Sequence, residues 1–128
     1  MASKQPVMIN EIMGEDFFSL GRIQVQYWKT EIQNGAPTQV LEKIFEKQVN
    51  FSLQGADALQ VQKQGFSDWA DNEFFILYMK DQLPIYTAQG RWFKIIVDGK
   101  EYTLRRSQPW IAYNKYWISR QSNSLNNY

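Results

Sequence analysis

Residues 91–117, RWFKIIVDGKEYTLRRSQPWIAYNKYW, contain two strand-like runs on either side of the dipeptide Asp98-Gly99. Residues 92–97 precede the dipeptide and residues 101–105 follow it, and both runs are rich in aromatic and β-branched side chains. Asp-Gly suits a type I′ turn, in which both central residues adopt positive φ. The stretch therefore predicts a tight β-hairpin with Asp98 and Gly99 as its structural turn.

The end of this stretch adds a further strand. Pro109 ends the second strand of the hairpin, because proline has no backbone N–H to donate to a ladder. Residues 113–119 then alternate aromatic and polar side chains, which is typical of a strand. We therefore expect a three-stranded antiparallel meander in the C-terminal half of the chain.

Strand patterns also occur in the N-terminal half. Residues 22–32 place Ile23, Val25 and Tyr27 at alternate positions, and Asn34-Gly35 with Pro37 marks a turn or loop. Residues 40–53 fit both helical and strand spacing. The strand pattern is longer and contains β-branched and aromatic residues, so we assign a strand from about Ile44 to Leu53.

The middle of the chain contains one short helical segment and one apolar strand. Residues 55–62 are good helix formers but few, and residues 74–80 are strongly β-prone. Turn signals about every ten residues favour a mainly β fold, either a small antiparallel β-barrel or a sandwich, with short helical connections. We expect a single domain over residues 1–128, with a flexible N-terminal arm at 1–14 and a flexible C-terminal tail at 122–128.

Composition limits the chemistry that is available. The 128-residue chain contains neither His nor Cys and carries a net charge of +1. Thiol nucleophiles, zinc–thiolate sites and the commonest general base are therefore excluded, and no strong basic field attracts nucleic acid. The glycines form no phosphate-binding loop, and no run is long and apolar enough for a secretory signal or a membrane span. We predict no enzymatic activity, no cofactor, no metal and no membrane partner.

Pairs of carboxylates are candidates for catalysis. Glu15-Asp16 and the pair Asp68 and Asp71 are close in sequence, and Glu73 follows shortly after. A glycosidase needs two carboxylates on opposite sides of a sugar, and turn-like contexts favour Asp for structural reasons. We interpret these residues as turn and capping residues, and keep a carboxylate-based hydrolase as the rival class.

Basic and aromatic residues are interleaved along the predicted hairpin. Single-strand nucleic-acid binders use such a face, here carrying Trp92, Tyr102 and Arg105. The aromatic content of 16% also exceeds what one small barrel has to bury, which favours either outward-facing aromatics that form protein interfaces or an aromatic-rich core with a few exposed tyrosines. The interface candidates are Trp69, Trp110, Tyr113, Tyr116 and Tyr128.

The order of parts from about Val49 to Gln121 resembles the small head–tail connector proteins of long-tailed bacteriophages, also called head-closure, stopper or tail-completion proteins. The parts are a strand, the helical stretch GADALQV, a loop ending in FSDWAD, the strand EFFILYMKD, the turn VDGKEYTL and the end PWIAYNKYWISRQ. One departure is Arg91, where the family usually has Asp. The positions that match the family pattern are Gly90, Ile96, Gly99, Lys100, Tyr102, Leu104, Trp110 and Tyr113.

This resemblance implies a structural protein of the virion neck, assembled in the host cytoplasm. Its partners would be the portal or adaptor and the tail proteins, further copies in a ring, and genomic DNA that passes through the channel without sequence-specific binding. The mechanism would be mechanical, with termini that order on assembly. The alternative is a single-strand nucleic-acid-binding or peptide-binding β module without catalysis.

Overall fold

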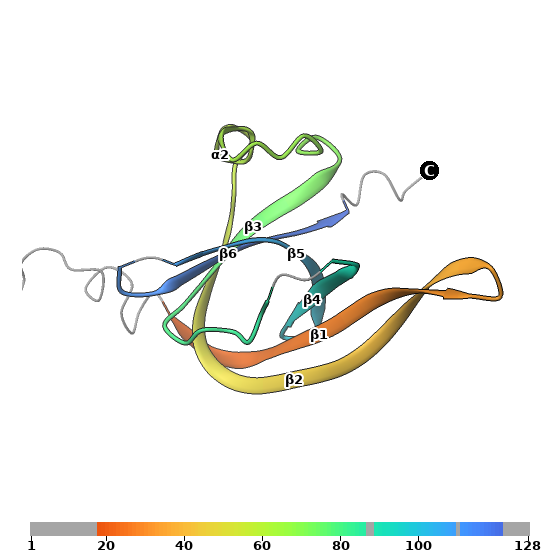
Figure 1. The fold of residues 1–128 in the computed structure, drawn as a ribbon. Helices are drawn as coiled ribbons and strands as arrows, with labels where there is room; N and C mark the ends of the chain where they lie inside the picture. Colours follow the sequence, from red (N-terminus) through yellow and green to blue (C-terminus); the bar gives the residue numbers. More distant parts are fainter. Residues whose placement is uncertain (1–17, 87–88, 110, 122–128) are drawn as a thin grey trace, which may run out of the picture.

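The computed structural model describes residues 18–86, 89–109 and 111–121. Its six strands are antiparallel and close into a ring-like barrel in the order β1-β2-β3-β6-β5-β4 (Figure 1). The mainly β prediction is confirmed, and the barrel is the form adopted. The elements are β1 (Ser19–Gln33), β2 (Ala36–Gly55), α2 (Ala58–Lys63), β3 (Asn72–Met79), β4 (Arg91–Val97), β5 (Lys100–Pro109) and β6 (Asn114–Gln121).

The predicted hairpin is the pair β4–β5. Asp98 and Gly99 have φ values of 48° and 85°, as a type I′ turn requires. Asp98 also ties the turn to β1, since its N–H donates to the Arg22 carbonyl (3.1 Å) and its Oδ1 accepts from the Arg22 N–H (3.2 Å). Strand β5 ends at Pro109 and pairs with β6, which confirms the C-terminal meander.

The core lies inside the barrel, where each strand places alternate side chains. Ile23, Val25 and Tyr27 of β1 are buried there, as their alternation predicts. The connection from β3 to β4 crosses one end of the barrel and inserts Leu83 into the core. The Tyr116 hydroxyl accepts from the Leu83 N–H (2.8 Å), and the Tyr27 hydroxyl donates to the Pro84 carbonyl. These bonds hold the crossing segment over the barrel end.

Strand β2 begins eight residues earlier than the expected Ile44, so the prediction that Pro37 lies in a loop is wrong. The turn at Asn34-Gly35 is the cause, because φ values of 53° and 79° give a tight type I′ turn that continues the ladder on both sides. Pairs in such a ladder alternate between hydrogen-bonded and non-hydrogen-bonded. Gln33 and Ala36 flank the turn as a hydrogen-bonded pair, so the next pair, Ile32 with Pro37, is not hydrogen-bonded. The backbone nitrogen of Pro37, which has no hydrogen, therefore faces away from β1.

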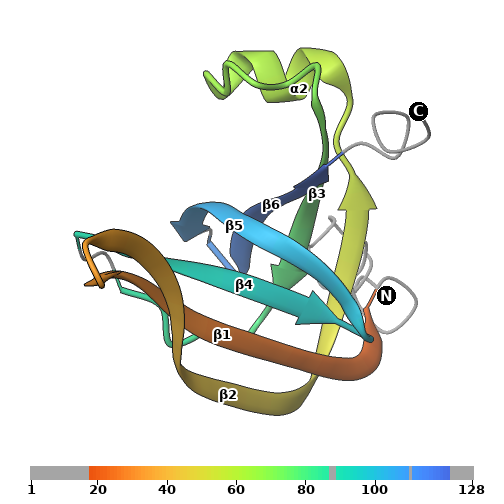
Figure 2. The same ribbon diagram turned by 90° about the vertical axis from the view of Figure 1, so that its right-hand side faces the viewer.

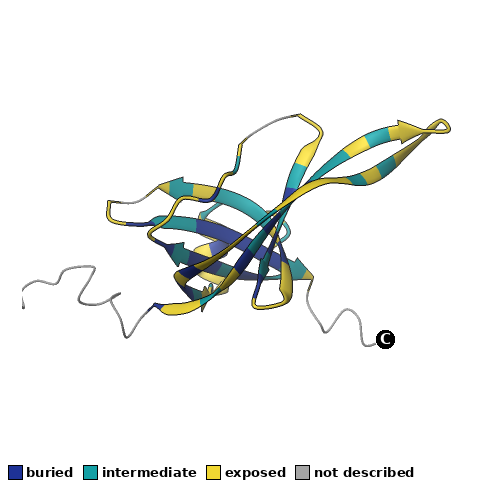
Figure 3. Cartoon of the chain, turned by 90° about the horizontal axis from the view of Figure 1, so that it is seen from below, coloured by how far each residue is buried: buried dark blue, intermediate teal, exposed yellow. Residues whose placement is uncertain are grey.

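The hairpin of β1 and β2 extends beyond the barrel. Strand β4 pairs with β1 only as far as Lys29, and the Thr30 N–H donates to the Gly90 carbonyl (3.0 Å). Residues 30–39, which we call the arm, project past this point as a two-stranded ribbon (Figure 1), and Figure 3 shows them mainly exposed. Strand β2 pairs with β3 only over residues 51–55, so residues 36–50 have β1 as their one described strand partner.

Helix α2 packs on the outer face of the barrel. It begins with a capping box, in which Asp57 Oδ1 accepts from the Gln60 N–H (2.8 Å) and Gln60 Oε1 accepts from the Asp57 N–H (3.0 Å). Figure 2 shows α2 beyond the ends of β2 and β3. A second core forms beneath the helix and the loop that follows, made of Val61, Phe66, Phe74, Ile76 and Trp117.

Gly21 of β1 lies close to both Phe51 of β2 and Asp98 of the β4–β5 turn. A β-carbon there would overlap the Phe51 ring edge and lie 2.9 Å from Asp98 Oδ1. We expect Gly21→Ala to lower the free energy of unfolding by about 1–3 kcal/mol through overpacking. Gly55→Ala is the matched control, with no atom within 4 Å of the added carbon, and should change it by less than about 0.5 kcal/mol. Urea unfolding measures both, and equal losses would contradict the packing described here.

Candidate interaction surfaces

A β-bulge positions a carboxylate at the root of the arm. Tyr27 pairs with Lys43 and Trp28 with Leu41, which leaves Glu42 as the extra residue of β2. Glu42 Oε1 accepts from Arg91 Nε (3.0 Å), and Glu42 Oε2 accepts from Arg91 Nη2 (3.1 Å) and lies 3.5 Å from Lys29 Nζ. The bidentate bond from Arg91 lowers the pKa of Glu42. The bulge therefore fixes the direction in which the arm leaves the barrel.

Two tryptophans stack on the outer face beside this root. The rings of Trp28 and Trp92 are 5.4 Å apart with an angle of 15° between their planes. The Trp92 indole N–H donates to Gln39 Oε1 (2.8 Å), which connects β4 to the arm. The Lys94 ammonium lies 5.1 Å from the centroid of Trp28 and also bonds Glu101 (3.3 Å). The two stacked tryptophans therefore stabilise the base of the arm and form a rigid aromatic surface next to it.

The arm and the neighbouring part of β2 expose apolar side chains and strand edges. Ile32 at the tip is 70% exposed, and Leu41 and Ile44 are also exposed. Two-stranded ribbons are only marginally stable in water, and an unpaired strand edge is a template for another chain. This surface has the features of a protein interface, because apolar side chains and free backbone groups occur together.

A second bulge positions Arg105 beneath the loop that follows α2. Leu104 pairs with Ile118 and Arg106 with Trp117, so Arg105 is the extra residue of β5. Its guanidinium lies 5.0 Å from the Phe66 and Phe74 ring centroids and donates to Asp68 Oδ1 (2.9 Å) and Ser119 Oγ (3.1 Å). Arg106 donates to the Gln64 carbonyl (3.0 Å). Both arginines therefore hold the loop against the sheet.

The Asp68–Arg105 pair predicts a pH-dependent contribution to stability. The hydrogen bond from Arg105 is the main cause that lowers the pKa of Asp68. The contribution is therefore present above the unfolded-state pKa of about 3.9 and is lost as the pH falls through the lowered folded-state pKa.

The comparison that tests this is wild type against Asp68→Asn. We expect the variant to be less stable at pH 7 by up to about 1 kcal/mol, a small value because solvent screens the partly exposed pair. The difference should disappear at the acid end of a pH series of thermal unfolding curves. A difference that persists unchanged at the lowest pH would show that the carboxylate charge is not its cause.

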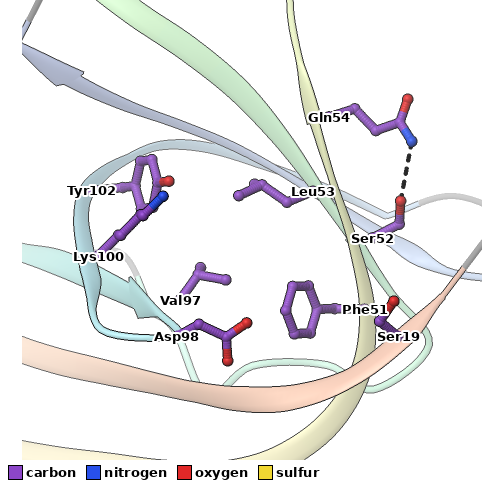
Figure 4. Close-up of a pocket in the computed structure, with 9 residues that line it drawn as sticks. All are labelled: Ser19, Phe51, Ser52, Leu53, Gln54, Val97, Asp98, Lys100 and Tyr102. Carbon is purple, nitrogen blue, oxygen red and sulfur yellow. Dashed lines mark hydrogen bonds between the residues drawn. The ribbon is translucent and has the colours of Figure 1, made fainter.

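A pocket of about 460 Å³ opens beside the β4–β5 turn (Figure 4). Phe51, Leu53, Val97 and Tyr102 give it apolar walls, while Asp98 and Lys100 lie at its rim. Its size suits a small ligand, but Asp98 already accepts from the Arg22 backbone and is part of the turn. The Ser52 hydroxyl in its wall accepts a hydrogen bond from Gln54 Nε2 (3.1 Å).

Two carboxylates of the rival hydrolase, Asp68 and Glu73, take part in ion pairs, while Glu15 and Asp16 lie outside the described residues. Asp68 bonds Arg105, and Glu73 Oε1 accepts from Arg120 Nε (2.7 Å). Asn72 donates to both the carbonyl and the carboxylate of Asp68. Within residues 18–86, 89–109 and 111–121, no three His, Cys, Asp or Glu side chains gather closely enough to hold a metal ion.

The predicted interface aromatics have different environments. Trp69 is 40% exposed in the loop after α2, as expected. The expectation that Tyr113 and Tyr116 face outward is wrong, because they are 7% and 1% exposed. Tyr116 points into the barrel and binds the crossing segment, and Tyr113 packs edge-on against Tyr78. Trp110 and Tyr128 lie outside the described residues, as do the predicted terminal segments 1–14 and 122–128.

The predicted nucleic-acid face is not assembled. Trp92 lies on the outside of the barrel, whereas Tyr102 is buried inside it and Arg105 is held by Asp68. Sequence reasoning missed the arm and the role of Glu42. The strand-like residues on both sides of Asn34-Gly35 are the sequence signal for the arm, but a proline at position 37 favours a break in the strand.

No protein-family model matches this chain, and no curated protein matches it. Among the helices of the described segments, none has the length and apolar character to cross a membrane. Within the described residues, the arm with the adjoining edge of β2 is the main candidate surface, because exposed apolar side chains and an unpaired strand edge occur there together.

Proposed function

We propose that this protein is a structural subunit of a ring in the neck of a long-tailed bacteriophage, where it joins the head to the tail. It is a head-completion component of the virion and is assembled in the host cytoplasm. Its neighbours are further copies of itself, the portal or adaptor, and the tail proteins. It performs no catalytic step, and its action is mechanical.

The projecting arm is the observation that carries this proposal. The arm offers a ribbon with the exposed side chain of Ile32, and the rest of β2, residues 40–50, offers a strand edge whose one described partner is β1. Two different surfaces on one chain permit a head-to-tail contact, and repeating such a contact closes a ring when the rotation allows it. In this arrangement the arm of each copy lies along the β2 edge of the next.

The charge of the chain fits a channel that DNA passes through. A net charge of +1 gives little non-specific affinity for phosphates, so DNA would not be held as it moves. Arg105, Arg106 and Arg120 are engaged with Asp68, Gln64 and Glu73 rather than free to neutralise phosphates. A ring that must let DNA pass needs this weak, sequence-independent contact.

Mass spectrometry of purified particles tests the proposal. We expect peptides of this chain at several copies per particle, in a fixed ratio to the portal. An electrophoretic shift with single-stranded DNA at low salt tests the alternative binding module, and we expect no tight complex. A chain that is absent from particles and binds oligonucleotides tightly would overturn the assignment. A monomer in solution would not, because a portal raises the effective concentration of neighbouring copies.

A further inference from the structure

A groove of about 430 Å³ lies between α2, the loop that follows it and the start of β3. Most of its wall residues are small or apolar, with Ala58, Val61, Trp69 and Phe74 among them, and Asn72 and Glu73 are the polar ones. Trp69 is exposed at one side, and no atom lies within 4 Å of the position where Gly55 would carry a β-carbon. The groove is therefore open, apolar and large enough to take one or two side chains.

The chain leaves the barrel at the rim of this groove. Gln121, the last residue of β6, is the register partner of Asn72, and Asn72 lines the groove. Residues 122–128, SNSLNNY, continue from there, beyond the described part of the chain. A chain spans at most about 3.3–3.6 Å per residue, so Leu125 lies within about 14 Å of Gln121 and Tyr128 within about 25 Å. Both can reach the groove of their own copy.

The chemistry of this segment matches the groove. Leu125 and Tyr128 are its two large apolar side chains, and the other five residues are Ser and Asn. The segment carries no charged side chain, and the one carboxylate in the groove wall, Glu73, is already paired with Arg120. Entry of the Leu125 and Tyr128 side chains would therefore bury apolar surface, and the nearby Glu73 carboxylate is already paired.

We propose that the groove binds residues 122–128 of the same chain, with Leu125 and Tyr128 packed against Trp69 and the alanines of the wall. Attachment at Gln121 favours this occupant, since a short tether gives an effective concentration in the millimolar range. The aromatic pair of Tyr128 and Trp69 adds specific ring packing to the burial of apolar area.

Photo-cross-linking of the full-length chain tests the occupant. A benzophenone amino acid replaces Tyr128, and equal amounts of ¹⁵N-labelled and unlabelled protein are mixed before irradiation. We expect cross-links from position 128 to residues 56–74 within single copies. The same probe at Ile111, which is 93% exposed, is the control and should not reach the groove. Cross-links to other parts of the chain would overturn the proposal. Cross-links between labelled and unlabelled copies would also overturn it, because the groove would then hold the segment of a second copy.

Hydrogen exchange gives a second readout. The double variant Leu125→Ser with Tyr128→Ser should raise exchange of residues 55–72 about threefold or more, because a bound segment protects the groove by mass action. The polar control Asn123→Ser with Asn126→Ser should leave exchange unchanged. Unchanged exchange in the first variant would contradict the proposal. Both experiments use the isolated protein, so neither outcome depends on the role in the particle.

Discussion

Replacing Leu77 by alanine is expected to lower the free energy of unfolding by about 3 kcal/mol. Leu77 is 0% exposed and lies on β3, where its side chain points into the barrel core. Removing it deletes apolar contacts and leaves a cavity that a closed barrel cannot readily fill by collapse. Urea unfolding, followed by tryptophan fluorescence, measures the loss as a lower midpoint at unchanged slope.

The matched control is Leu59→Ala on α2. Leu59 is 61% exposed, so its truncation should change the free energy of unfolding by less than about 0.5 kcal/mol. Both variants make the same chemical change, and the difference between them isolates burial. Equal losses at the two positions would contradict the placement of the core inside the barrel.

Shortening the arm is expected to abolish incorporation into particles while the barrel remains folded. The variant deletes the two pairs nearest the turn, Ile32 with Pro37 and Gln33 with Ala36, and joins Glu31 and Thr38 through Asn34-Gly35. Cross-strand residue pairs in the hairpin alternate between hydrogen-bonded and non-hydrogen-bonded. Removing two of them makes Glu31 and Thr38 the pair that flanks the turn, and this pair is hydrogen-bonded, as the turn requires. The contact with the neighbouring copy loses the exposed tip and its apolar side chain.

Incorporation is measured by mass spectrometry of particles after complementation with each variant. We expect a decrease of at least about tenfold, which corresponds to about 1.4 kcal/mol of contact free energy. The thermal midpoint of the isolated protein should stay within about 3 °C of wild type, because all four deleted residues are exposed. The length-preserving control Gln33→Thr with Ala36→Thr should assemble normally. Normal incorporation of the shortened variant would show that the arm does not form the contact between neighbouring copies.

Much of the barrel is predictable from local sequence. Asp98-Gly99 specifies its turn through positive φ, and the alternation around Ile23 to Tyr27 specifies which face is buried. Strand β3 shows the limit of this reasoning. Phe75 and Leu77 face the barrel core while Phe74 and Ile76 lie under α2, so both faces are apolar and the strand has no alternation to detect.

The two bulges could not be predicted, because an extra residue is defined by the register of a partner strand. Glu42 and Arg105 look like ordinary strand residues in the sequence, yet each is the unpaired residue that forms an ion pair at a junction. The burial of Tyr116 is hard to predict for a similar reason. Its hydroxyl has a partner, the Leu83 N–H, that comes from a segment more than thirty residues away.

Electron cryo-microscopy of the neck in purified particles tests the central claim most directly. The account predicts a ring of six-stranded barrels between portal and tail, in which residues 30–39 of each copy contact the β2 edge of the next. Neck density that other proteins fill completely, or a ring of these barrels whose arms touch no neighbouring copy, would contradict it.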